Sequence, residues 1–164
     1  MTTSKPEFVY TTYIRATPER LWQALTDPAF TRRYWGGVAW ASDWQAGSSL
    51  TLELGENGVK IADPAQVVLE SKPGRRLSYT WHTFTPEWAA AYEISDEYLA
   101  RVAAERRSKV TFDIEQLGEL VKLTVTHDDF EPGSAVLEGI TQGWPRILSD
   151  LKTLLETGDT LPVG

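Results

Sequence analysis

Apolar side chains near the end of the chain recur every three to four residues from Ser134 onward. This spacing predicts one long amphipathic helix with an apolar stripe along one side. The stripe consists of Val136, Leu137, Ile140, Trp144, Ile147, Leu148, Leu151, Leu154 and Leu155. It includes Gly143-Trp144-Pro145, where the proline removes a backbone donor and is expected to bend the helix. A bent helix over a concave sheet would leave a hollow beneath it.

Short runs that alternate between apolar and polar residues fill the middle of the chain and predict β-strands. The predicted strands are 8–15, 38–44, 49–54, 65–71, 75–84, 109–116 and 120–127. In the fifth run, Leu77, Tyr79 and Trp81 share an apolar side, whereas Ser78 and Thr80 share a polar side. This pattern is typical of an antiparallel sheet that is covered on one face only.

Helix start signals predict four shorter helices. Thr17-Pro18 and Asp27-Pro28 each place proline after a preferred N-cap residue, so two short helices are expected after the first strand. Thr85-Pro86 repeats this signal, and Ser95 can cap another helix whose first turn is acidic. We interpret 85–108 as a helical flap inserted between two strands.

The amino-acid composition excludes several classes of function for this protein. The chain has 164 residues, enough for one domain over 1–164, and a formal net charge of −7. That charge argues against nucleic-acid binding, which depends on clustered Lys and Arg. The absence of cysteine excludes disulfides and thiolate chemistry. No apolar run is long enough for a membrane span and the beginning of the chain does not resemble a signal peptide, so a cytoplasmic location is expected.

Four stretches in this order resemble a known family. They are Ile14 to Pro28, Ser42 to Gly47, Leu77 to Trp81, and Thr126 to Trp144. The chain resembles the START-like, or SRPBCC, superfamily, also called the birch-pollen-allergen fold. Within it, the chain is similar to the bacterial branch related to the activator of heat-shock-protein ATPase. The resemblance implies an α+β helix-grip fold, in which a curved antiparallel sheet wraps around the long C-terminal helix.

The same resemblance implies a cavity between sheet and helix that accepts small apolar molecules, but it implies no single chemistry. The leading hypothesis is therefore the binding of a small hydrophobic or aromatic molecule, with no cofactor. One alternative is an enzyme related to polyketide cyclases and hydrolases that uses the same cavity. Another is a chaperone-associated or regulatory module that binds other proteins. The oligomeric state stays open, with a homodimer as one alternative.

Inward-facing aromatic residues are the best candidates for contact with such a ligand. The candidate set is Trp35, Trp40, Tyr79, Trp81, Phe112, His127, Trp144 and Leu148. Each of them could equally be ordinary core. Trp88 and Tyr92 on the flap are candidates for a gate over the opening, or they anchor the flap without closing it.

The two histidines differ in their expected surroundings. His127 falls on the apolar side of its strand, where it is either a general base at the cavity mouth or a buried residue satisfied by a carbonyl or carboxylate. His82 falls on the polar side of its strand and is expected to be solvated. Two histidines on opposite faces cannot supply the three converging ligands of a zinc site, so no metal is expected.

Overall fold

A computed structural model describes residues 6–55, 58–81 and 84–162. The elements, in chain order, are β1 (Phe8–Ile14), α1 (Pro18–Thr26), α2 (Pro28–Tyr34), β2 (Val38–Ala41), β3 (Ser49–Leu54), β4 (Val59–Lys72), β5 (Arg76–Trp81), α3 (Pro86–Ala91), α4 (Asp96–Ala103), β6 (Ser108–Leu117), β7 (Leu120–Asp128) and α5 (Ala135–Thr157). The order of helices and strands agrees with the prediction. His82, predicted to be solvated, lies outside the described residues.

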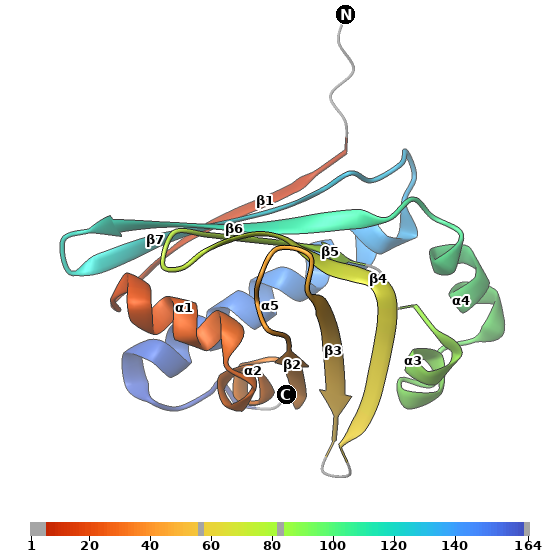
Figure 1. Cartoon of the computed structure of the whole chain (residues 1–164), viewed down its shortest axis with the longest axis horizontal. Helices are drawn as coiled ribbons and strands as arrows, with labels where there is room; N and C mark the ends of the chain where they lie inside the picture. The colour runs from red at the N-terminus through yellow and green to blue at the C-terminus, as the bar shows by residue number, and fades with distance from the viewer. Residues whose placement is uncertain (1–5, 56–57, 82–83, 163–164) are drawn as a thin grey trace, which may run out of the picture.

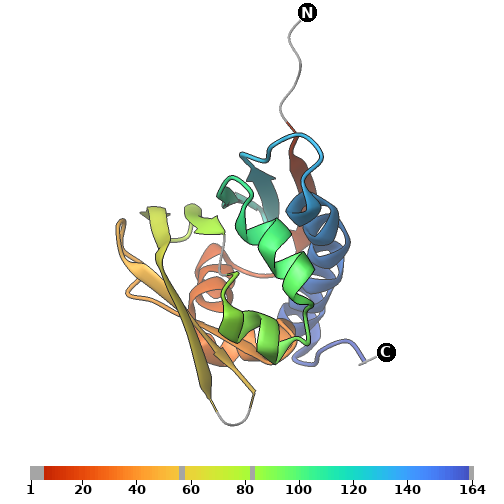
Figure 2. The ribbon, with the colours of Figure 1, turned by 90° about the vertical axis from the view of Figure 1, so that its right-hand side faces the viewer.

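The seven strands form one antiparallel sheet in the order β1-β7-β6-β5-β4-β3-β2. β3 and the adjoining part of β4 turn sharply away from the plane of β1, β7 and β6, so the sheet is strongly curved (Figures 1 and 2). The long helix α5 lies inside this curve, as Figure 1 shows. The α+β helix-grip fold is therefore confirmed.

Strand alternation places one face of the sheet against α5. On β7, Val121, Leu123, Val125 and His127 are all fully buried. The opposite face is less uniformly exposed to solvent than predicted, because Ser78 is buried there. Its hydroxyl donates to the Val110 carbonyl at 3.0 Å and is also hydrogen-bonded to the hydroxyl of Thr111 at 3.0 Å. Polar side chains can be buried on this face because they satisfy one another.

Several strand boundaries differ from the prediction, and two of the differences have a visible cause. β2 ends at Ala41, before the predicted end, because Ser42 accepts a hydrogen bond from the backbone of Trp44, which has a positive φ of 54°. β4 begins at Val59, well before the predicted start, and an irregularity in its register with β3 accommodates the proline at position 64. Bulges of this kind interrupt the alternation by which a strand is recognised in sequence.

The predicted N-caps all form. Thr17 and Thr85 accept hydrogen bonds from backbone groups at the starts of α1 and α3, and Asp27 does the same for α2. Ser95 caps α4, which follows α3 in the flap. Figure 2 shows α3 and α4 across one end of the molecule, between the β3–β4 arm and α5.

Helix α5 begins at the predicted residue, since Ser134 accepts a hydrogen bond from the backbone of Leu137 at 3.0 Å. The helix continues through Pro145 without interruption and ends at Thr157, where the C-cap residue Gly158 has a left-handed φ of 86°. A bend at Pro145 stays a prediction. No helix within the described ranges is long and apolar enough to cross a membrane.

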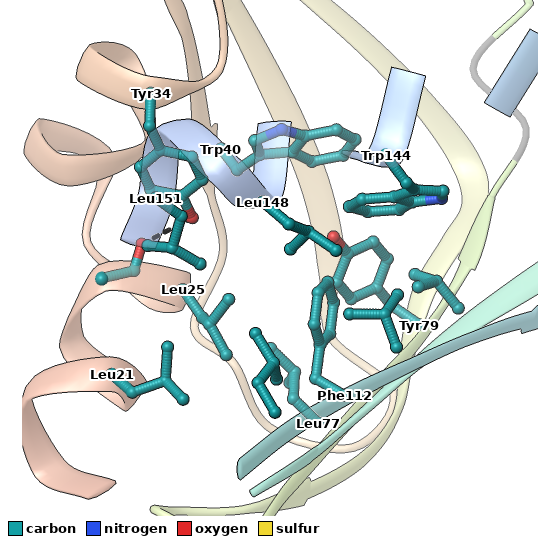
Figure 3. Close-up of a cluster of buried hydrophobic side chains, with 14 of the residues drawn as sticks. Leu21, Leu25, Tyr34, Trp40, Leu77, Tyr79, Phe112, Trp144, Leu148 and Leu151 are labelled. Atoms are coloured by element: carbon teal, nitrogen blue, oxygen red, sulfur yellow. Dashed lines mark hydrogen bonds between the residues drawn. The ribbon is translucent and has the colours of Figure 1, made fainter. Parts of the chain in front are cut away.

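Under the middle of α5 the interior is packed. Trp144 and Leu148 extend from the helix toward Tyr79 and Phe112 on the sheet (Figure 3). The Trp144 and Phe112 rings lie edge to face with their centroids 5.8 Å apart. Any hollow must therefore lie elsewhere along the helix than beneath the Gly143-Trp144-Pro145 segment.

Candidate functional site

A cavity of about 300 Å³ lies between the flap, the β2–β5 part of the sheet and the first turns of α5. We call it the flap cavity. It is lined by Trp35, Val38, Trp40, Leu52, Trp81, Phe84, Trp88, Tyr92, Ile94, Tyr98, Val102, Val136, Gly139 and Ile140. None of these side chains carries a formal charge at neutral pH, so the wall suits an apolar guest.

Three indoles form the sheet side of this wall. The ring centroids of Trp35 and Trp40 are 5.3 Å apart, those of Trp40 and Trp81 are 5.5 Å apart, and those of Trp35 and Trp81 are 6.1 Å apart. Trp35 comes from the C-cap of α2, whereas Trp40 and Trp81 point inward from β2 and β5. The corner between helix and sheet thus brings together residues from three separate elements.

The flap forms the side of the cavity wall opposite the sheet. The Trp88 ring packs on Phe84 at 4.9 Å and on Tyr92 at 6.0 Å between centroids. Tyr92 is 46% exposed, so it stands at the rim, where partial burial of its ring raises the pKa of the phenol. Both predicted gate residues therefore line the flap cavity. Whether they open and close it stays a prediction.

The start of α5 completes the wall with Val136, Gly139 and Ile140. Gly139 is exposed, and a β-carbon at this position would meet only the hydroxyl of Tyr98, at 3.9 Å. The missing side chain leaves the rim open between α5 and α4. Gly139 therefore offers a position from which the opening can be filled by substitution.

The remaining ligand candidates lie in the packed core and not in the cavity wall. Tyr79, Phe112, Trp144 and Leu148 are at most 3% exposed and belong to the main hydrophobic cluster. Burial raises the pKa of Tyr79 well above its ordinary value. A contact of these four residues with ligand stays a prediction, and the site is best built on Trp35, Trp40, Trp81, Trp88 and Tyr92.

His127 is fully buried and holds hydrogen bonds on both ring nitrogens. Its Nδ1 accepts from the indole Nε1 of Trp144 at 3.1 Å, and its Nε2 lies 2.9 Å from the hydroxyl of Ser108. An indole can only donate, so Nδ1 must be unprotonated and Nε2 carries the proton. Burial lowers the pKa of His127 to about 3.

This tautomer leaves His127 without a lone pair for proton abstraction. It also donates to Ser108, whereas a base that activates a serine must accept from it. The histidine is thus buried and satisfied, as the second interpretation expects, although its partners are a hydroxyl and an indole in place of the expected carbonyl or carboxylate. Within the described part of the chain, no three His, Asp or Glu side chains are grouped to hold a metal.

Several cavity residues were not singled out from the sequence. Val38, Leu52, Phe84, Ile94, Tyr98, Val102, Val136, Gly139 and Ile140 also line the wall. Leu52, Val136 and Ile140 carried a usable signal, since all three lie on predicted apolar faces. What the pattern could not reveal is which part of each apolar face meets the flap, because that depends on how distant segments pack.

The family model described as Activator of Hsp90 ATPase homolog 1-like protein matches residues 15–156. The chain belongs to this family. The match spans β2 to β7 and nearly all of α5, so it includes every described residue of the cavity wall. It confirms the resemblance noted from the sequence.

Solved structures share the fold. Protein MLL2253 from Mesorhizobium loti is 23% identical with a TM-score of 0.67, covering 92% of this chain and 96% of that one. The Aha1 dimer from Colwellia psychrerythraea is 18% identical with a TM-score of 0.66, covering 93% and 98%. DynU16, from the dynemicin biosynthetic locus, is 18% identical with a TM-score of 0.68, covering 94% of this chain and 48% of that one. No curated protein sequence matches the chain.

Proposed function

We propose that this family member binds a small apolar or aromatic molecule in the flap cavity. The observation that carries the proposal is the uncharged wall, in which indoles from the sheet face aromatic rings from the flap. Burial of a guest against such a wall is favourable because it removes apolar surface from water. The volume of about 300 Å³ limits the guest to a compact molecule.

A biosynthetic setting for one relative is consistent with this proposal. DynU16 is a protein of the dynemicin biosynthetic locus and shares the fold. Among the described wall residues the hydroxyls of Tyr92 and Tyr98 are the only acid–base groups, because His127 is outside the wall and its lone pair is occupied. Binding without turnover is therefore the function that the residues support best.

Titration of compact aromatic compounds, followed by tryptophan fluorescence and thermal unfolding, tests the proposal. A ligand that binds only the folded state raises the unfolding temperature in a concentration-dependent way. The variant Gly139→Phe should strongly weaken binding, because its ring fills the opening beside Tyr98. Gly143→Phe is the matched control, since a β-carbon at Gly143 meets no atom within 4 Å and this residue is not in the wall. Equal binding by both variants would contradict the proposal.

The family name favours a second candidate, association with a chaperone ATPase. Its test is the ATPase rate of a bacterial Hsp90 with and without this protein, repeated with Gly139→Phe. Stimulation that persists in the variant would assign this activity to a surface other than the flap cavity.

A homodimer likewise stays a prediction, motivated by the dimeric Colwellia protein. Sedimentation velocity of the full chain decides it.

A further inference from the structure

A second space adjoins the flap cavity beside the end of the chain. This cleft of about 600 Å³ lies between the end of α2, the later part of α5 and the residues that follow α5. We call it the tail cleft. Trp35, Val38 and Tyr92 line both spaces, so the flap cavity and the tail cleft adjoin at these three side chains.

Helix α5 runs from one space to the other. Ile140 lines the flap cavity, whereas Ile147 lines the tail cleft. Gly143 lies between them on the same face, because residues three or four apart share one side of a helix. A β-carbon at Gly143 would meet no other heavy atom within 4 Å. The helix face between the two spaces is therefore open at Gly143.

The tail cleft differs from the flap cavity because two cations line it. Arg33 donates to the carbonyl of Gly158 at 2.9 Å, and Arg146 donates to the carbonyl of Pro162 at 2.8 Å. Within the described ranges neither guanidinium forms an ion pair with a carboxylate. A guanidinium has five N–H donors, and both residues are exposed. A guest in the cleft can therefore reach donors on each of them.

The wall of the tail cleft also carries one carboxylate. Asp150 accepts a hydrogen bond from the backbone N–H of Leu161 at 2.6 Å, so it holds the end of the chain in place. Two arginines against one aspartate leave the cleft with a positive charge, although the whole chain has a formal charge of −7. A positive site next to an apolar cavity favours a guest that is apolar at one end and anionic at the other.

We propose, on the basis of the ligand binding proposed above, that the preferred guest continues from the flap cavity into the tail cleft and ends there in a carboxylate. Its apolar end lies among the indoles, its chain passes beside Gly143, and its carboxylate accepts hydrogen bonds from Arg33 and Arg146. The volume of the flap cavity then limits only the apolar end. Arg146 follows Gly139 by seven positions, so at about 1.5 Å per residue the guest must span roughly 10 Å.

The pair 6-phenylhexanoate and 6-phenylhexanamide tests this proposal, because the two compounds share a carbon skeleton and differ in the charge at one end. Isothermal titration of the full chain should show the carboxylate binding about ten-fold more tightly, as expected for charged hydrogen bonds to guanidinium groups. The difference should shrink as the salt concentration rises, because salt screens exposed charges. Phenylacetate is too short to reach the arginines from the flap cavity and should bind no more tightly than phenylacetamide.

Variants locate the two ends of the guest. Arg33→Gln and Arg146→Gln should each reduce the preference for 6-phenylhexanoate over its amide several-fold. Arg32→Gln makes the same change in charge at a residue that pairs with Glu53 outside the cleft, so it should keep the preference. Gly143→Phe should remove the preference by blocking the passage, while compact aromatic compounds still bind in the flap cavity.

The outcomes separate this inference from the proposed function. Equal affinity of the wild type for 6-phenylhexanoate and its amide overturns the inference but leaves apolar binding intact. A preference that persists in Gly143→Phe, or in both variants of the cleft arginines, also overturns it. Undiminished binding of 6-phenylhexanoate by Gly139→Phe would place the ring outside the flap cavity, with the same consequence. Failure of every compound to bind overturns the function itself. The wild-type comparison needs no variant to fold.

Discussion

The indole of Trp144 donates its Nε1 proton to Nδ1 of His127 over 3.1 Å, joining α5 to β7 through one buried hydrogen bond. The bond makes His127 a neutral acceptor on one side and a donor to Ser108 on the other. A residue that looks like an acid–base catalyst in the sequence therefore holds the long helix against the sheet. The effect of this hydrogen bond on the stability of the protein can be measured.

Acidification should destabilise the protein through His127. Its pKa is about 3 in the folded state against 6.5 for an ordinary histidine, so the unfolded chain binds the proton first as the pH falls. Stability should therefore rise with pH between about pH 3 and 6.5, with His127 contributing at most about 1.4 kcal/mol per pH unit. Urea unfolding at several pH values in this range should show that the free energy of unfolding rises more steeply with pH for the wild type than for His127→Gln. Parallel slopes would contradict the prediction.

Replacement of Trp144 by phenylalanine should remove both the hydrogen bond and part of the core. The buried Nδ1 of His127 would lose its donor, and the smaller ring would leave space beside Phe112. We expect a loss of about 2–4 kcal/mol in the free energy of unfolding. Trp22→Phe, at a partly exposed position on α1, is the control and should cost less than half as much in the same urea titration.

Two glycines within α5 can be replaced with a gain in stability. A β-carbon at Gly139 meets only the Tyr98 hydroxyl at 3.9 Å, and one at Gly143 meets nothing within 4 Å. Alanine at either position should stabilise the protein by about 0.5–1 kcal/mol, because glycine loses more backbone entropy in a helix. Thermal unfolding measures this gain. Gly158→Ala should instead destabilise, since φ there is +86°.

The flap is tied to the start of α5 by Glu105. Its carboxylate accepts hydrogen bonds from the Ser134 hydroxyl and from the backbone N–H of Ala135, the latter at 2.9 Å. Glu105→Ala should cost about 1–2 kcal/mol, because it removes an anion from the helix N-terminus and frees its donors. Hydrogen exchange should speed up in α4 more than in β7. Uniform acceleration across both elements would show that Glu105 does not hold the flap specifically.

Prediction from sequence succeeded where a feature depends only on residues that are close together in the chain. Thr17, Asp27, Thr85 and Ser95 were recognised as caps because their short side chains bond to backbone groups two or three residues away, whatever the rest of the chain does. The alternation on β7 was equally clear, since no irregularity interrupts its pairing with β6.

Prediction was weaker where distant segments set the outcome. The first part of β4 was missed because the irregular register near Pro64 breaks the two-residue period. The sequence could not separate core from cavity wall along α5, where Trp144 and Leu148 pack against the sheet. Apolar residues on one helix face have the same periodicity whether they meet side chains or a cavity.

By itself, the sequence determined the element order, the caps, the buried faces and the family, because these depend on spacing and local hydrogen bonding. Only the tertiary structure decided that Trp35, Trp40 and Trp81 meet the flap around one cavity. It also decided that His127 has no free lone pair, and that the Gln66 amide is buried with no hydrogen-bond partner among the described residues. Those properties arise from side chains far apart in the chain, whose positions are set by the curvature of the sheet and the docking of the flap.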